Sequence, residues 1–181
     1  RVVVATSTID ATVGGASANS YCTLAEAKQY VEDRYVGSST AWSGASDNDL
    51  NQALLFSTRI IESTIIFTGF VKTDTQALLW PRYGMTKRNE YALADDIIPQ
   101  ELKDCESEFA RGLIVDVSRT DDSDPETQGI RNLKAGPVAI TFDETAALKL
   151  IPDLAYLYLP AMWIESTRGR VSATRVLVRS Y

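Results

Sequence analysis

The stretch Gln76-Ala77-Leu78-Leu79-Trp80-Pro81-Arg82-Tyr83-Gly84 is the one from which the fold of this chain can be predicted. The ring of Pro81 excludes the helical region of backbone space for the residue before it, so Trp80 is expected to be extended. An indole in such a turn packs in a core more often than it stacks on a ligand. We therefore interpret Trp80 and Pro81 as core residues, and ligand stacking by Trp80 is the alternative.

A strong helix signal follows this turn. Pro99 fixes a helical φ at a position where a backbone N–H would have no partner, so a helix is expected to begin there. Apolar residues then recur at spacings of three and four, which places them on one face of the helix: Leu102, Cys105, Phe109, Leu113 and Val117. We expect Trp80 to pack against Leu102 or Phe109, so that these residues and Pro81 form the centre of the core.

An earlier helix is marked by a capping signal. Thr23 and Glu26 have the spacing of a capping box, in which each side chain accepts a hydrogen bond from the backbone N–H of the other residue. The predicted helix extends to about Tyr35. Residues 37–40 contain little apolar material and are predicted to form a flexible loop.

Two more helices are predicted from similar signals. Ser46 and Asp49 repeat the start signal, and the apolar pattern that follows indicates a core helix from Asp47 to roughly Ile66. Residues 153–159 form a short predicted helix, because Pro152 lies at its first turn and Pro160 limits its length.

The second half of the chain adds β structure. Apolar and polar residues alternate near the end of residues 130–142, which predicts strand, and Gly136-Pro137 confines that segment to a sheet edge or a bend. The predicted fold class is mainly α with small β elements: a helical bundle core, a β-hairpin or strand insertion and an extended C-terminal arm. Residues 1–165 are expected to form one domain, which includes the insertion at 116–145, and residues 166–181 the arm.

The first part of that insertion is strongly acidic. Residues 116–126 contain five carboxylates and one arginine, a density that favours an exposed loop because like charges repel and solvate. A calcium loop would need alternating ligands that end in a glutamate at the twelfth position, and this pattern is absent. We expect no metal site here.

The composition limits the chemistry that the chain can perform. The 181 residues include no histidine, which removes the usual general base, the commonest zinc ligand and the His-activated nucleophiles. Cys22 and Cys105 have no metal-type spacing and are interpreted as buried hydrophobic residues. The net charge of −6 argues against a protein that grips DNA through bulk electrostatics, and no apolar run reaches the length of a membrane span. We expect no enzyme activity, no cofactor and no membrane partner.

The C-terminal arm is the one basic element. It has four arginines and no carboxylate after Glu165, and its β-branched content suits strand addition to the edge of a neighbouring sheet. The residues expected to bind a partner are Arg168, Arg170, Arg175, Val176, Val178, Arg179 and Tyr181. Two alternatives stay open: a final strand of the domain's own sheet, and contact with DNA phosphates.

Several motifs together resemble a known family. They are Ala18-Asn19-Ser20-Tyr21 before the first helix, the stretch around Trp80-Pro81-Arg82, the segment Ile98-Pro99-Gln100-Glu101 and the later Gly136-Pro137-Val138 and Pro152-Asp153-Leu154. In this order they are similar to the head–tail connector, or adaptor, proteins of tailed bacteriophages and prophages, some of which carry the label of DnaT-like single-stranded-DNA-binding protein. The resemblance covers roughly residues 18–159.

The resemblance implies a structural protein of the virion neck, assembled in the host cytoplasm. Such adaptors form a ring, commonly twelve-fold, beneath the portal protein. They extend the channel for genomic DNA without binding it specifically, and they dock the next neck or tail-completion protein. The alternative function is a single-stranded-DNA-binding module, which needs basic side chains among stacking aromatic rings. Lys87, Arg88 and Tyr91, near Tyr83, are the only candidates in the sequence for such a patch.

Overall fold

The computed structural model describes residues 6–34, 40–115, 132–135, 138–141 and 151–167, and the fold is mainly α with small β elements. The helices are α1 (Leu24–Arg34), α2 (Thr40–Gly44), α3 (Asp47–Thr64), α4 (Gln100–Val115) and α5 (Asp153–Tyr158), with the 3-10 turn η2 (Ala161–Trp163). The strands are β1 (Ile65–Phe67), β2 (Phe70–Val71), β3 (Arg82–Tyr83), β4 (Asn132–Ala135), β5 (Val138–Thr141) and β6 (Ile164–Thr167). The predicted fold class is confirmed.

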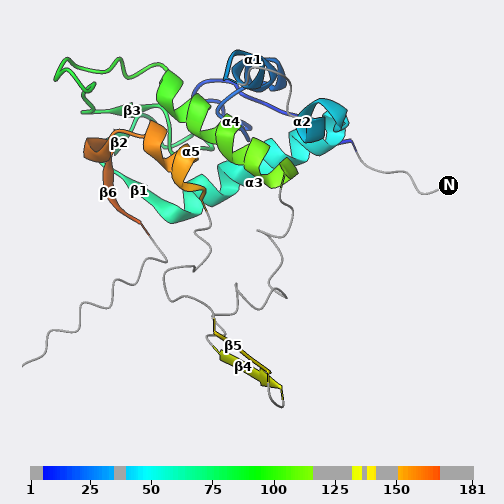
Figure 1. The fold of residues 1–181 in the computed structure, drawn as a ribbon. Helices are drawn as coiled ribbons and strands as arrows, with labels where there is room; N and C mark the ends of the chain where they lie inside the picture. The colour runs from blue at the N-terminus through cyan, green and yellow to red at the C-terminus, as the bar shows by residue number, and fades with distance from the viewer. Residues whose placement is uncertain (1–5, 35–39, 116–131, 136–137, 142–150, 168–181) are drawn as a thin grey trace, which may run out of the picture.

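Helix α4 is the central element of the packing. It lies along α3 and also contacts α1, α2 and α5, so that it is enclosed by the other helices (Figure 1). Gly112 allows α5 to approach closely, because a Cβ atom at this position would lie 3.3 Å from the side chain of Pro152. The apolar face of α4 predicted from its spacing is therefore the face around which the core forms.

The predicted helix starts are confirmed. The backbone N–H of Thr23 donates to the Glu26 carboxylate at 2.7 Å, and the N–H of Glu26 donates to the Thr23 hydroxyl at 3.2 Å, which is a complete capping box. The Ser46 hydroxyl likewise accepts from the N–H of Asp49 at 3.2 Å. These local signals suffice to fix where α1 and α3 begin.

The end of α3 differs from the prediction. The helix ends at Thr64, and Ile65, Ile66 and Phe67 form β1, which pairs antiparallel with β6. The consecutive β-branched residues favour extended backbone once a partner strand is available. The predicted arm boundary at residue 166 accordingly falls inside β6, whose last residue, Thr167, pairs with Ile65.

Helix α2 was not predicted, because the sequence before Trp42 indicates a flexible loop. Trp42 is buried, with 5% of its surface exposed, and its packing in the core explains a helical turn in a stretch of low propensity. Strands β2 and β3 also form a small antiparallel pair. Gly69, just before β2, has φ +67°, and a Cβ atom there would lie 2.6 Å from the carbonyl oxygen of Tyr83.

Within the predicted strand region at 130–142, the described residues form two antiparallel strands, β4 and β5, paired from Asn132 with Thr141 to Ala135 with Val138. The acidic segment 116–126 lies outside the described residues, as do residues 168–181 of the predicted arm. Among the described residues, no helix has both the length and the apolar character needed to cross a membrane.

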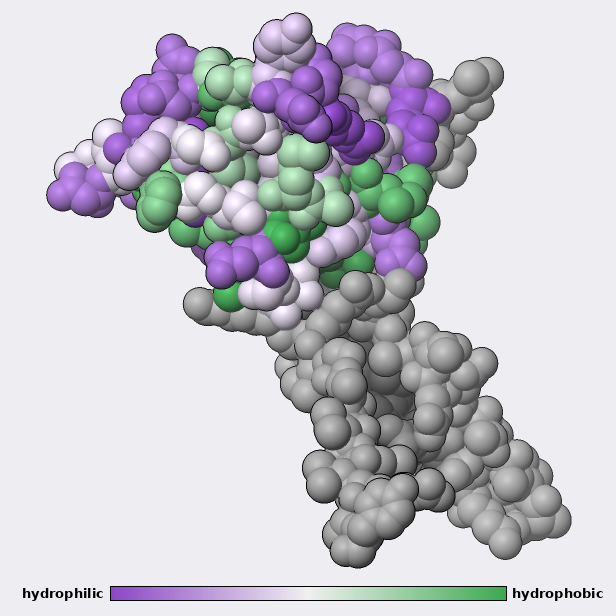
Figure 2. Space-filling view, turned by 90° about the vertical axis from the view of Figure 1, so that its left-hand side faces the viewer, coloured by the Kyte–Doolittle hydropathy of each residue, from purple (hydrophilic) through white to green (hydrophobic). Residues whose placement is uncertain are grey.

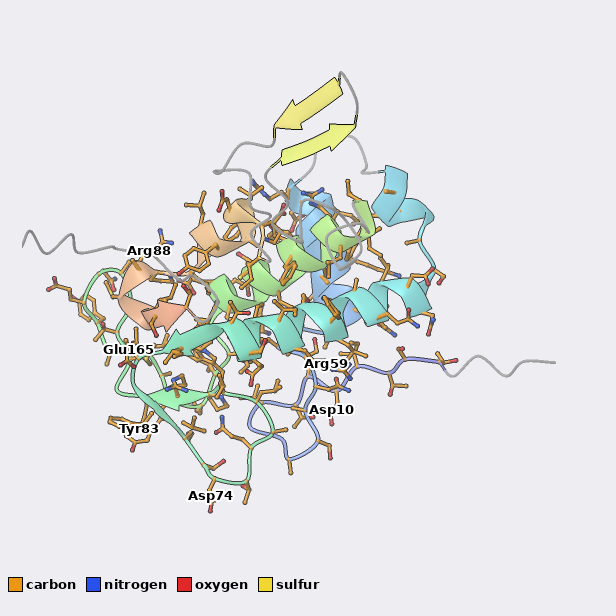
Figure 3. The ribbon with its side chains drawn as sticks, turned by 90° about the horizontal axis from the view of Figure 1, so that it is seen from below. Asp10, Arg59, Asp74, Tyr83, Arg88 and Glu165 are labelled. Carbon is orange, nitrogen blue, oxygen red and sulfur yellow. The ribbon has the colours of Figure 1, made fainter. Side chains whose placement is uncertain are left out.

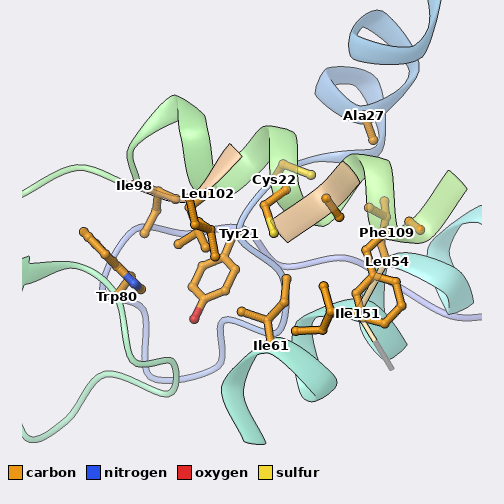
Figure 4. Close-up of a cluster of buried hydrophobic side chains, with 14 of the residues drawn as sticks. Tyr21, Cys22, Ala27, Leu54, Ile61, Trp80, Ile98, Leu102, Phe109 and Ile151 are labelled. Atoms are coloured by element: carbon orange, nitrogen blue, oxygen red, sulfur yellow. The ribbon is translucent and has the colours of Figure 1, made fainter. Parts of the chain in front are cut away.

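The core contains the tryptophan from the central turn. Trp80 is 1% exposed, its ring meets Phe67 edge-on at 5.6 Å and Trp163 at 5.3 Å, and the Trp80–Pro81 peptide bond is cis. Leu102 and Phe109 are completely buried in the same cluster, which Figure 4 shows from α3 to α4. Trp80, Leu102 and Phe109 are thus all buried in one cluster, and the rings that meet Trp80 are those of Phe67 and Trp163, which the sequence did not indicate. Cys22 and Cys105 are also buried, and neither forms a disulfide.

Candidate functional site

A buried carboxylate on α4 binds the segment that precedes α1. Glu106 is completely buried, and its Oε1 accepts hydrogen bonds from the hydroxyls of Ser20 at 2.7 Å and Thr58 at 2.5 Å. Its Oε2 accepts from the backbone N–H groups of Tyr21 at 3.0 Å and Cys22 at 2.9 Å. One side chain of α4 therefore fixes the Ser20-Tyr21-Cys22 backbone and connects it to α3.

A second carboxylate connects the same tyrosine to the central turn. Glu62, near the end of α3, accepts a hydrogen bond from the Tyr21 hydroxyl and from the backbone N–H of Leu79, whose nitrogen lies 2.9 and 3.1 Å from the two carboxylate oxygens. Tyr21 thus bonds to Glu106 through its backbone and to Glu62 through its ring. The two carboxylates join the motif before α1 to the turn that contains Trp80.

Arg82 completes this arrangement from the other side of the turn. Its guanidinium donates to four backbone carbonyl groups, those of Phe67, Thr68, Gly69 and Leu79, at 2.8 to 3.2 Å. Arg82 is only 7% exposed, and burial lowers its pKa while the nearby Glu62 carboxylate opposes this change. The arginine of the central motif is therefore a structural tie between the β1–β2 connection and the turn.

Both carboxylates have strongly raised pKa values. Burial raises the pKa of Glu106 to about 7, although the hydrogen bonds from Thr58, Ser20 and Cys22 act in the opposite direction. Burial also raises the pKa of Glu62 to about 7, against the N–H of Leu79 and the charge of Arg82. Among the described residues, neither carboxylate has a lysine or arginine nitrogen within ion-pair distance.

Glu108, a second buried carboxylate of α4, differs from both in its partners. Glu108 is 1% exposed, but its Oε1 pairs with Arg111 Nη2 at 2.8 Å and its Oε2 accepts from the Tyr30 hydroxyl at 3.0 Å. Glu108 thus has a cationic partner in Arg111, whereas Glu62 and Glu106 accept hydrogen bonds from neutral donors. Only the latter two connect the motif before α1 to the helices and the turn.

Carboxylates that titrate near neutral pH are often catalytic, so their access to solvent matters. Glu106 is completely enclosed, and four hydrogen bonds from hydroxyl and backbone N–H groups surround its carboxylate. In the described part of the chain, no group of three His, Cys, Asp or Glu side chains is placed to bind a metal ion. The geometry around Glu106 is that of a structural network.

Two hollows border the central turn on its outer surface. One, of about 380 Å³, is lined by Ala18, Asn19, Thr58, Arg59, Glu62, Ser63 and Leu78. The other, of about 430 Å³, is lined by Val71, Lys72, Thr73, Asp74, Gln76, Ala77, Leu78, Leu79 and Tyr83. Leu78 lines both, so residues 73–79 separate one hollow from the other.

The aromatic and basic residues considered for DNA binding do not form one groove. Arg88 donates to the carbonyl oxygen of Tyr158 at 3.1 Å, and Figure 3 shows Arg88 and Tyr83 well apart, with Glu165 between them. Tyr83 instead stacks on Phe70, with the ring centroids 5.3 Å apart. Lys87 and Tyr91 are exposed, and the N–H of Lys87 donates to the Tyr91 carbonyl oxygen at 2.7 Å.

Exposed large apolar side chains include two groups on different elements, and Val13, Tyr91, Ile97 and Val115 are exposed elsewhere in the described chain. On α5 and η2 they are Leu154, Leu157 and Met162, at 38%, 71% and 47% exposure. On β2 and β3 they are Phe70 and Tyr83, at 64% and 47%. In Figure 3, α5 and Tyr83 lie on either side of α3. Figure 2 shows that hydrophobic residues gather between hydrophilic ones on the face turned to the viewer.

A comparison with known protein families shows to which family the chain belongs. The family model described as "Putative DnaT-like ssDNA binding protein" matches residues 6–179, nearly the whole chain. The chain belongs to this family. No curated protein and no solved structure matched the chain. The match begins before the described motif at residues 18–21 and extends past the last described residue, Thr167, so it includes both the network and the predicted arm.

The sequence did not identify Glu62 or Glu106 as important residues. Glu106 lies four residues after Leu102 and three before Phe109, so helical spacing places it beside the apolar face of α4. Glu62 lies four residues after Thr58, a buried residue of the same helix α3. This spacing was the only signal, and it did not indicate which groups the carboxylates bind. The predicted arm residues Arg168 to Tyr181 lie outside the described residues.

Proposed function

We propose that this protein is a structural head–tail adaptor of a tailed bacteriophage or prophage, a ring subunit that binds the portal protein above and the next neck or tail protein below. The observation that carries the proposal is the pair of separate apolar surfaces, one on α5 and η2 and one on β2 and β3. Contiguous exposed apolar groups on a small domain are typical of protein–protein interfaces.

Ring geometry gives a reason for two different surfaces. In a closed ring, each subunit contacts its neighbours head to tail, so one patch must meet a different patch on the next copy. Leu157, at 71% exposure on α5, and Phe70, at 64% on β2, belong to two such patches. A subunit that also docks a portal and a tail protein needs further surface of this kind.

The negative net charge of the chain supports a channel whose wall does not bind DNA tightly. Twelve copies of a chain with net charge −6 would carry a formal charge of −72 around the channel. A negative wall repels phosphate groups and lets DNA slide, whereas a basic wall would retain it. In this proposal the arginines beyond Thr167 bind portal or neighbouring carboxylates, for which the planar guanidinium is well suited.

The proposal is tested by the oligomeric state of the pure protein, alone and with the cognate portal, measured by native mass spectrometry and negative-stain imaging. We expect rings for the wild type and loss of rings for Leu157→Asp, because a charge at a buried apolar contact is costly. Leu157→Met is the matched control and should still assemble. A monomeric wild type that does not bind the portal would contradict the proposal.

Single-stranded-DNA binding is the second candidate, and the exposed Phe70–Tyr83 stack favours it. Base stacking on aromatic rings is the usual sequence-tolerant contact with single strands. A mobility-shift assay at low salt with a single-stranded oligonucleotide separates the two functions. Tight binding of the oligonucleotide that is lost in Phe70→Ala would support this candidate. Binding too weak to saturate would exclude it and favour the adaptor function.

A further inference from the structure

We propose that residues 90–97, which we call the edge segment, accept residues 168–181 of another copy of this chain as an added β-strand. The inference rests on the proposed ring assembly and deepens it, because it names two surfaces through which neighbouring copies meet.

The edge segment has an unpaired backbone edge. The N–H of Leu93 donates to the Met85 carbonyl oxygen at 2.9 Å, and Thr86 faces Ala92 as an isolated antiparallel bridge. Because the bond at Leu93 flanks this bridge, Thr86 and Ala92 form a non-hydrogen-bonded pair, in which the backbone groups of each residue point away from the other strand. Ala92 is exposed and has no hydrogen bond to any described residue. Its N–H and C=O groups are therefore open to a further strand.

The side chains of the edge segment combine apolar surface with negative charge. Tyr91 is 73% exposed and Ile97 is 40% exposed. The exposed carboxylate of Asp95 pairs with Lys72 at 3.0 Å, whereas Asp96 has no cation within ion-pair distance in the described part of the chain. This surface suits a strand that carries both arginines and apolar residues.

Glu90 takes a backbone conformation that favours glycine. Its φ is +68°, and no other non-glycine residue among those described has a positive φ. Glycine would adopt this conformation without steric cost, and such outliers often lie at functional sites. Like Asp96, Glu90 has no cation within ion-pair distance among the described residues. Arg88, in the same turn, instead donates to the Tyr158 carbonyl oxygen at 3.1 Å. A carboxylate that binds a partner gives a reason for glutamate at this position.

The arm has the complementary composition. Residues 168–181 contain four arginines and no carboxylate, whereas the edge segment contains three carboxylates and no lysine or arginine. Alternate residues of an extended strand share a face, so Val176 and Val178 would lie on one face. Arg175 and Arg179 would lie on the other. In strand addition, the main-chain hydrogen bonds supply affinity, and each guanidinium can bind a carboxylate through two parallel bonds.

The course of β6 favours a neighbouring copy over the same copy. Trp163, just before β6, donates its indole N–H to the Thr86 carbonyl oxygen at 2.6 Å, whereas Thr167, at the end of β6, pairs with Ile65. Strand β6 thus leads the chain away from the hairpin that contains the edge segment (Figure 1). Residues 168–181 span up to about 48 Å when fully extended, at about 3.4 Å per residue, which exceeds the roughly 30 Å diameter of a small domain.

The test is chemical crosslinking between copies of the full-length protein. Arg175→Lys and Arg179→Lys, made together, keep the positive charge and supply amines that a carbodiimide couples directly to carboxylates. Heavy and light isotope-labelled copies are mixed, assembled, crosslinked and analysed by mass spectrometry. We expect links from positions 175 and 179 to Glu90, Asp95 or Asp96, each joining a heavy copy to a light one.

Loss of charge in the edge segment should weaken this contact. In the same crosslinking protein, Glu90→Gln and Asp96→Asn together should reduce the links and raise the protein concentration needed for ring formation by roughly two- to thirtyfold, the range for two exposed ion pairs. Glu32→Gln, at an exposed carboxylate of α1, is the matched control and should change neither measurement.

A second readout uses the unsubstituted protein, in case the lysine variants do not assemble. The amide of Ala92 should exchange its hydrogen more slowly in assembled rings than in dissociated subunits, because the added strand accepts its hydrogen bond. Equal exchange in the two states would overturn strand addition at this edge.

The crosslinking outcomes separate this inference from the proposed function. Rings in which positions 175 and 179 link only within one copy, or only to other carboxylates, would overturn the docking site and leave the ring. Heavy–light links to the edge segment without rings would support the docking site and contradict the ring. Absence of both rings and links would overturn both.

Discussion

Glu106 shows how a single buried residue can organise distant parts of a chain without a counter-ion. Its carboxylate replaces the hydrogen bonds of water with four donors, two hydroxyls and two backbone N–H groups. Each donor would itself be unsatisfied if the carboxylate were removed, and an unsatisfied buried group costs about 1–3 kcal/mol. The Glu106 carboxylate and its four donors therefore satisfy one another's hydrogen bonds.

The first prediction concerns the pH dependence of stability. The pKa values of Glu62 and Glu106, about 7 in the folded chain, lie above the ordinary glutamate value of 4.5, so the folded state binds more protons than the unfolded state. Their contribution to the free energy of unfolding is complete below pH 4.5 and is lost as pH rises to about 7. Urea denaturation should show a smaller decrease over this range for Glu106→Gln than for the wild type. An equal decrease in both would contradict the prediction.

The lowered pKa of Glu26 has the opposite effect at a different pH. This carboxylate accepts from Lys103 and Thr23, so its contribution to stability is present above pH 4.5 and is lost as the pH falls further. The two effects can therefore be measured in separate pH ranges.

The second prediction concerns Trp80 in the core. Trp80→Ala should lower the free energy of unfolding by about 3–5 kcal/mol, as expected for a large-to-small change in a packed core. Trp80 is 1% exposed and touches two other aromatic rings, so the cavity cannot be filled easily. Tyr91→Ala, at 73% exposure, is the control and should change stability by less than about 0.5 kcal/mol. If Trp80→Ala melts like the wild type, the core assignment is wrong.

At the scale of elements, the helices were easier to predict than the strands. The starts of α1, α3 and α4 depend on groups three residues apart or on a proline, and these signals are present in the local sequence. The end of α3 depends on β6, about a hundred residues further along the chain, because Ile65 becomes strand only where Thr167 pairs with it. Helix α2 depends on the burial of Trp42, which no local pattern indicates.

The third prediction tests one of these local signals. Ser46→Ala should cost about 1 kcal/mol, because the N–H of Asp49 loses its acceptor at the start of α3. Thermal or urea denaturation measures this change. Thr75→Ala, at an exposed position of the loop before Trp80, is the matched control. Equal stability of the two variants would show that the Ser46 cap contributes little.

At the scale of the whole molecule, the buried network could not have been predicted from the sequence. Glu106 and its donors at residues 20–22 are 84 to 86 positions apart, so no periodic pattern links them. Glutamate on a helix is usually solvated, and spacing alone does not separate a buried carboxylate from an exposed one. The sequence did predict the regions that the network joins, since the motif before α1 and the Trp80-Pro81-Arg82 turn were both identified.

The fourth prediction concerns assembly and the residues beyond Thr167. Deletion of residues 171–181 leaves every strand of the described sheets intact, so the shortened chain should fold and melt near the wild-type temperature. If the arm joins neighbours, the shortened protein should fail to form rings or to bind the portal in native mass spectrometry. Unfolding of the shortened chain would place this segment in the core. Normal assembly would exclude the arm model.

The long-range contacts of Glu106 also have a consequence for biosynthesis. The Ser20-Tyr21-Cys22 segment leaves the ribosome before its acceptor exists, because 84 residues separate Cys22 from Glu106. At 5–20 residues per second, the wait is roughly 4–17 s. Closing so long a loop also slows folding relative to local helix formation. During this interval the segment before α1 is available to chaperones and proteases, and the emergence of α4 ends that exposure.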